Sequence, residues 1–227
     1  MKRTIVVLSV IVLALSLTAF AASKNGAFTS PDGRITFMPG RAVNHGSPAA
    51  QSKDPVLFSE LATKDPKGLY WCCEGWTISG PNSVIAEEIW YAQAFTPAAN
   101  SHATKLTFQI SYVEGTYTDV IMAIYDDCSG VPCSSPVWSK KVTLDTETFG
   151  ECCTLEKQSV HPAVALTGGT QYWVAATTES ASDIWAAFNM GVLDQVDDTN
   201  QADYESGTWY AFSYSLDAAL EVSGTVP

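Results

Sequence analysis

Hydrophobic and polar positions follow a clear pattern in the stretch Val164–Thr178. A short apolar run, Val164–Leu166, meets a Thr-Gly-Gly-Thr turn, and a second run, Gln171–Thr178, leaves it. Glycines supply the positive φ of a tight turn, so the pattern predicts a strand, a turn and a second strand. Because both faces of Gln171–Thr178 are largely apolar, we expect a central strand that is buried on both sides.

Comparable runs, separated by turn residues, recur along the chain. Thr104–Val113 alternates between apolar and polar residues, which predicts one half-buried antiparallel strand. Regularly spaced short strands, with no convincing long helix, predict an all-β antiparallel β-sandwich or jelly roll over residues 67–227. The other predicted strands are Leu69–Ile78, Glu88–Thr96, Asp119–Tyr125, Val137–Leu144, Cys152–Val160, Ile184–Met190, Trp209–Tyr214 and Ala218–Ser223.

The first 66 residues have a different composition. Lys2 and Arg3 precede an apolar run, Ile5–Phe20, whose end overlaps an Ala-x-Ala site. This order predicts a signal peptide over residues 1–21 and a secreted protein, extracellular or periplasmic. The alternative, an uncleaved membrane anchor, is disfavoured because the run is barely long enough to span a bilayer. Residues 22–66 are rich in proline and glycine, so we expect a poorly packed extension with one strand near Arg34–Met38.

An acidic composition narrows the range of partners. The chain has a formal net charge of −12, and removal of Lys2 and Arg3 with the signal peptide makes it more negative. Such a charge disfavours nucleic acid and anionic membrane surfaces as partners. The polar segment Gly191–Gly207 carries acids that could bind Ca²⁺, although a solvated loop is the simpler interpretation, and we expect no other cofactor. These acids are Asp194, Asp197, Asp198, Asp203 and Glu205.

Six cysteines in an exported chain predict disulfide bonds that staple the sandwich. Cys128 and Cys133 flank a loop with a glycine and a proline, which can fold so that the two bridge. Two adjacent pairs leave alternatives open, because neighbouring side chains on a strand point to opposite faces. Each pair closes on itself, or a cysteine of one pair bridges to the other pair, which we favour because it joins distant strands. The pairs are Cys72–Cys73 and Cys152–Cys153.

The order of these signals over roughly residues 75–224 resembles exported bacterial β-sandwich domains of the choice-of-anchor type. The resemblance rests on the loop that runs from Ile124-Tyr-Asp126 into Gly130-Val-Pro132, on Leu166-Thr-Gly-Gly-Thr-Gln-Tyr-Trp173, and on the isolated Trp185. It implies an exported β-sandwich and no particular activity. Cys133 stands where these domains usually have glycine.

Seven tryptophans and nine tyrosines favour a carbohydrate-binding function, because aromatic faces can stack on sugar rings. Trp185 and Trp209 flank the acidic segment and are the candidate ligand-binding residues at the surface. Trp173, on the predicted central strand, is instead expected in the core.

Catalytic motifs such as G-x-S-x-G and H-E-x-x-H are absent from the sequence. We therefore expect a non-catalytic binding or structural module at or beyond the cell surface, with an extracellular glycan or a surface protein as partner. One alternative is a secreted carbohydrate-active enzyme, which needs two carboxylates, such as Glu87 and Glu88, in a groove. Another is a subunit that exchanges a strand in an extracellular assembly.

Overall fold

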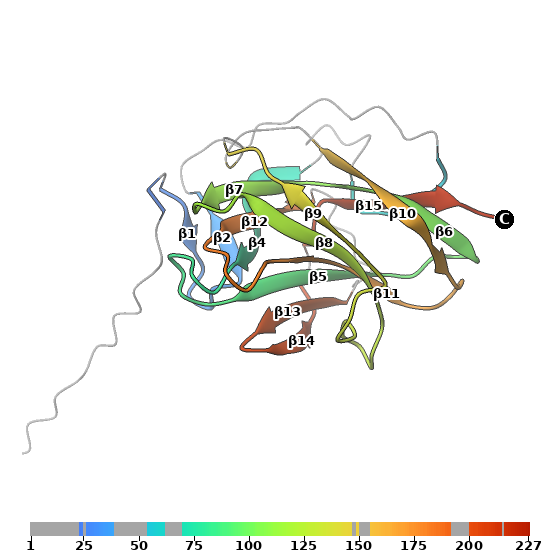
Figure 1. Ribbon diagram of the computed structural model, residues 1–227. Helices are drawn as coiled ribbons and strands as arrows, with labels where there is room; N and C mark the ends of the chain where they lie inside the picture. Colours follow the sequence, from blue (N-terminus) through green and yellow to red (C-terminus); the bar gives the residue numbers. More distant parts are fainter. Residues whose placement is uncertain are drawn as a thin grey trace, which may run out of the picture.

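Two antiparallel sheets build the protein, as the computed structural model in Figure 1 shows. The structure describes residues 23–24, 26–38, 54–61, 70–146, 149, 155–191, 200–214 and 216–227. Every strand pairing in these ranges is antiparallel, so the predicted all-β, sandwich-like fold is confirmed. Within the same ranges, no helix is long and apolar enough to cross a membrane.

The larger sheet follows the order β1-β2-β4-β5-β11-β8-β9, with β12 and β7 beside β4 and the hairpin β13–β14 beside β5. Its strands are β1 (Phe28–Thr29), β2 (Ile35–Phe37), β4 (Tyr70–Ser79), β5 (Ile89–Phe95), β7 (Ile110–Glu114), β8 (Asp119–Asp126), β9 (Trp138–Thr143), β11 (Tyr172–Thr177), β12 (Trp185–Gly191), β13 (Gln201–Glu205) and β14 (Thr208–Phe212). The smaller sheet follows the order β10-β6-β15-β3. Its strands are β10 (Glu156–Leu166), β6 (Ser101–Phe108), β15 (Leu220–Thr225) and β3 (Val56–Ser59).

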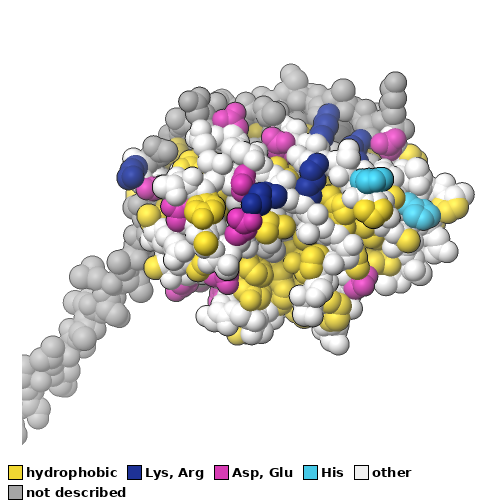
Figure 2. Space-filling model, viewed as in Figure 1, with side chains coloured by type: hydrophobic (Ala, Val, Ile, Leu, Met, Phe, Trp, Pro, Cys, Tyr) yellow, Lys and Arg dark blue, Asp and Glu magenta, His cyan; other side chains and the backbone are white. Residues whose placement is uncertain are grey.

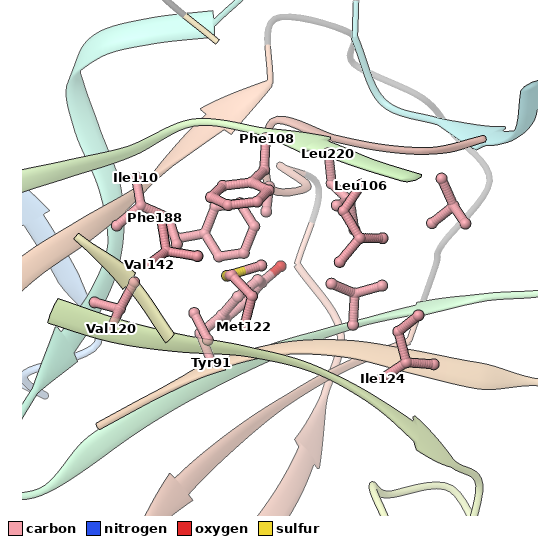
Figure 3. Packing of buried hydrophobic residues seen from close by; sticks show 14 of the residues in the cluster. Tyr91, Leu106, Phe108, Ile110, Val120, Met122, Ile124, Val142, Phe188 and Leu220 are labelled. Carbon is pink, nitrogen blue, oxygen red and sulfur yellow. The ribbon is translucent and has the colours of Figure 1, made fainter. Parts of the chain in front are cut away.

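The main hydrophobic core lies between the two sheets (Figure 3). Phe108 and Leu220 from the smaller sheet meet Met122 and Phe188 from the larger one, and all four are fully buried. β11 lies between β5 and β8, and all of its residues are buried. The prediction of a central strand buried on both sides is therefore confirmed.

The structure differs from the sequence-based prediction at two places. At each of them the chain crosses from one sheet to the other. Thr104–Val113 divides at Gln109 into β6, which pairs in the smaller sheet, and β7, which pairs in the larger one. The Thr-Gly-Gly-Thr turn joins β10 to β11, which also belong to different sheets and do not form a hairpin. A local pattern predicts a strand but not the sheet that accepts it.

Three short strands lie in the described parts of residues 22–66. The predicted strand near Arg34–Met38 is β2, which pairs with β1 and β4, while β3 pairs with β15 at the edge of the smaller sheet. The N-terminal segment thus contributes to both sheets. Because these strands have only two to four residues each, their periodicity is too short to stand out between prolines and glycines.

The outer face of the larger sheet carries a row of alanines. Ala211, Ala202, Ala92, Ala175 and Ala123 lie directly opposite one another on β14, β13, β5, β11 and β8. All but Ala211 are fully buried, although this face points away from the main core. Because alanine side chains are small, larger aromatic side chains can pack on top of them. These aromatic side chains form the candidate site.

Candidate functional site

The larger sheet curls around the alanine row. Tyr125 at the end of β8 and Trp209 on β14 have ring centroids 6.2 Å apart, although three strands separate β8 from β14. In a flat sheet, four strand spacings would separate their backbones by about 19 Å. The hairpin β13–β14 therefore folds over the outer face, and in Figure 1 it lies below β5 and β11.

Four aromatic side chains gather on this concave face, and we call them the outer aromatic site. Trp90 and Tyr204 stack in parallel with centroids 3.9 Å apart. Trp209 meets Tyr204 edge-on at 5.4 Å and also contacts Trp90 and Tyr125. Tyr125 is buried, while the other three remain partly accessible to solvent. Figure 2 shows hydrophobic side chains gathered at the lower centre, where Figure 1 places β5, β13 and β14.

A chain of polar side chains borders the site. The Asp127 carboxylate accepts hydrogen bonds from Trp173 Nε1 and Gln171 Nε2, both at 2.8 Å. Asn200, just before β13, donates its amide to Gln171 Oε1 at 2.9 Å. The chain links the disulfide loop after β8 to the base of the β13–β14 hairpin, and it ends at the exposed residue Asn200, four residues before Tyr204.

Burial and charge shift the titration of three groups around the rings. Burial raises the pKa of Glu88, which lies two residues before Trp90 and therefore on the same face. Burial, together with the negative charge of Glu88, raises the pKa of Tyr204. The pKa of Tyr125 is raised by burial and by nearby Tyr204. Glu88 thus places a carboxylate next to the aromatic rings.

The opposite face of β13 carries two further carboxylates. Asp203 is almost fully buried, and its Oδ2 lies 2.6 Å from Arg34 Nε, while Glu205 Oε1 lies 3.8 Å from the same nitrogen. The Arg34 guanidinium also sits 5.2 Å from the centroid of the Phe212 ring. Arg34 therefore fastens the turn before β2 to the β13–β14 hairpin.

A pH-dependent contribution to stability should come from Glu205. Burial raises the pKa of Glu205. A hydrogen bond with Asp203 and the negative charges of Asp203 and Glu87 raise this pKa further, while the positive charge of Arg34 lowers it. A carboxyl whose pKa is raised on folding stabilises the fold below its ordinary pKa of 4.5, and this contribution is lost as the pH rises through the raised pKa.

We therefore expect the free energy of unfolding of Glu205→Gln to fall less than that of the native protein between about pH 4 and about pH 7. Urea denaturation at both pH values measures the difference. Glu74→Gln, at an exposed position, is the matched control and should follow the native protein. Equal pH dependence in Glu205→Gln and the native protein would contradict the raised pKa.

Of the two predicted surface tryptophans, the structure places Trp209 in the outer aromatic site. Trp185 is fully buried, so its predicted position at the surface is wrong. Its indole Nε1 donates to Thr36 Oγ1 at 2.9 Å, and Ala27 from the N-terminal segment packs in the same cluster. The segment that hides Trp185 comes from the far end of the sequence, where the composition suggested poor packing.

The acidic segment is partly a strand rather than a loop. Asp203 and Glu205 belong to β13, where Arg34 holds them, whereas Asp194, Asp197 and Asp198 lie outside the described residues. Among the described residues, no cluster of three or more His, Cys, Asp or Glu side chains could hold a metal ion. A Ca²⁺ site in this segment stays the untested alternative to a solvated loop, and the Asp203 carboxylate is already paired with Arg34.

The predicted bond between Cys128 and Cys133 is present, with Cα atoms 4.9 Å apart. The Sγ atoms of Cys72 and Cys73 lie 2.6 Å apart in the buried part of β4. Cys152 and Cys153 lie outside the described residues. The pairing of the four remaining cysteines therefore stays a prediction.

Removing the Cys128–Cys133 bond with a Cys128→Ser/Cys133→Ser variant should lower the free energy of unfolding by about 2 kcal/mol, because the bond closes only a short loop. Denaturant titration of the two proteins measures this change. A loss above about 4 kcal/mol would contradict a purely local role, which chain entropy limits to about 2 kcal/mol. Such a loss would show that the disulfide bond also maintains the hydrogen bond between Trp173 Nε1 and the Asp127 carboxylate.

Three residues of the site escape prediction from the sequence: Trp90, Tyr125 and Tyr204. Two signals point to them. Glu88, Trp90, Ala92 and Ala94 occupy alternate positions and therefore share one face of the strand. This face begins with a charged residue, continues with an aromatic residue and ends with two small ones. Ser206 and Gly207 both have positive φ, the geometry of a tight hairpin turn, and the Ser-Gly pair between aromatic runs is a turn signal.

Comparison of the chain with protein-family models, with curated proteins and with solved structures finds no match. The resemblance to choice-of-anchor domains therefore stays a prediction from the sequence.

Proposed function

We propose that this protein is an exported, non-catalytic module that binds carbohydrate through the outer aromatic site. The observation that carries the proposal is the gathering of Trp90, Tyr204 and Trp209 on an outer sheet face. In antiparallel sandwiches this face is ordinarily polar, and apolar groups left partly exposed there mark an interaction site.

The chemistry of the site suits sugar rings. Aromatic rings supply apolar contact area at a low cost in conformational entropy, and the Asn200 amide and the Glu88 carboxylate can bond hydroxyl groups at its border. A disulfide bond in the adjacent loop and the signal-peptide pattern of residues 1–21 support export to an oxidising compartment.

Binding is favoured over glycoside hydrolysis by the position of the carboxylates. Hydrolysis needs two carboxyl groups that flank one bond of the substrate. Asp203 and Glu205 are close enough together, but they lie on the face of β13 opposite the aromatic rings, and Arg34 occupies them. Glu88 acts on the Tyr204 ring, and Asp127, at the border of the site, already accepts hydrogen bonds from Trp173 and Gln171.

Truncation of the central ring tests the proposal. We expect Trp209→Ala to weaken glycan binding about 30-fold, because central aromatic residues typically contribute 2 kcal/mol or more to an interface. A glycan array identifies a ligand for the native protein, and isothermal titration calorimetry compares the variants.

The matched control is Tyr210→Ala, which removes an exposed ring from the other face of β14 and should leave affinity unchanged. Circular dichroism confirms that both variants are folded. Failure of the native protein to bind any glycan, or equal affinity for the two variants, would overturn the proposal.

A further inference from the structure

Among the described residues, Glu88 is the carboxylate whose charge acts on a ring of the outer aromatic site, and it lies two residues before Trp90. It is partly buried just before β5, and its charge raises the pKa of Tyr204, whose ring stacks on that of Trp90. Its neighbour Glu87 is exposed and acts instead on Glu205, on the opposite face of the sheet. The two adjacent glutamates thus serve different sides of the molecule.

The charge of Glu88 has no cation to balance it in the described part of the chain. None of the ion pairs between described residues involves Glu88: Arg34 pairs with Asp203 and Glu205, and Lys141 pairs with Glu179 and Asp119. Lys24 and Lys105 make their ion pairs with Glu114 and Asp54. A partly desolvated carboxylate without a partner is unfavourable, and burial alone accounts for the raised pKa of Glu88.

A ligand cation would find two kinds of attraction at this place. The carboxylate supplies an opposite charge, and the faces of tryptophan and tyrosine rings attract cations through their quadrupoles. The formal net charge of −12 also raises the concentration of cations around the protein.

We propose that the outer aromatic site selects glycans that carry a free amine, with the ammonium group beside Glu88 and the sugar ring against Trp90 and Tyr204. This inference rests on the proposed carbohydrate-binding function and narrows it to amino sugars. A neutral glycan would leave the Glu88 carboxylate unpaired, and an anionic glycan would be repelled by it.

Two ligands that differ only at nitrogen provide the test. A β-1,4-linked glucosamine trisaccharide and its N-acetylated counterpart have the same length and linkage, but only the first carries ammonium groups. We expect calorimetry at a pH where the amines are protonated to show at least tenfold tighter binding of the free amine. Raising the salt concentration should reduce this preference, because salt screens partly exposed charges.

Substitution of the two adjacent glutamates assigns the preference to a side chain. Glu88→Gln should abolish the preference for the amine, whereas Glu87→Gln, one residue away on the opposite face, should retain it. Equal losses in the two variants would show a non-specific effect of net charge and would overturn the proposal, as would retention of the preference in Glu88→Gln.

The remaining outcomes separate this inference from the proposed function. Equal binding of both trisaccharides overturns the preference for amines and leaves carbohydrate binding in place. Failure of both the trisaccharides and the glycan array overturns both. A trilysine peptide that binds more tightly than the glucosamine trisaccharide would replace the amino sugar with a basic peptide as ligand.

Discussion

Trp173→Ala should lower the free energy of unfolding by about 3–5 kcal/mol, the range for truncating a large buried aromatic residue. Trp173 is fully buried on the central strand β11, between Ala94 of β5 and Tyr125 of β8. Its removal would leave a cavity under the outer aromatic site. It would also remove one of the three donors that hold the Asp127 carboxylate, which are Trp173 Nε1, Gln171 Nε2 and the Gly130 backbone N–H.

Thermal and urea denaturation measure the effect, and each kcal/mol should lower the melting temperature by roughly 2–4 °C in a protein of this size. Trp173→Phe is the control, because it keeps a ring in the cavity and removes mainly the indole hydrogen bond to the Asp127 carboxylate, which contributes about 1.5–3 kcal/mol, so it should cost less than Trp173→Ala. If Trp173→Ala cost less than about 1 kcal/mol, the outer face would not be the second core that its burial indicates.

Most strands could be predicted from the sequence because local alternation and turn residues determine them. The central strand β11 was recognisable from two apolar faces, and the Cys128–Cys133 bond from a short loop with a glycine and a proline. These features depend on neighbours in the sequence. Strand alternation and turn formation depend on interactions within a few residues of the chain, so they can be recognised in a single sequence.

The candidate site depends instead on contacts between distant segments. Glu88 and Tyr204 are far apart in the chain and become neighbours only because β13 pairs with β5 in one particular register. The alanine row becomes visible only when five strands are aligned, since a single alanine in a strand carries no signal of its own. The burial of Trp185 under the N-terminal segment is a contact of the same kind.

Arg34→Leu should destabilise the protein by about 3 kcal/mol, the lower end of the range for breaking a buried ion pair. The Asp203 side chain is only 4% exposed, so in the variant water cannot replace the lost guanidinium as its partner. The Arg34 side chain, in contrast, is 35% exposed and reaches solvent. The lost link also joins the turn before β2 to the hairpin that carries Tyr204 and Trp209, so the variant should loosen the outer aromatic site.

A double variant distinguishes this ion pair from ordinary packing. In Arg34→Leu/Asp203→Leu no buried charge remains unpaired, because Glu205, at 35% exposure, still reaches water. Replacing both members of a buried pair by apolar residues is often neutral or stabilising. We therefore expect the double variant to be more stable than Arg34→Leu alone. Urea denaturation of the native protein, both single variants and the double variant gives the coupling free energy, and strictly additive losses would show that Arg34 acts only through its packing on Phe212.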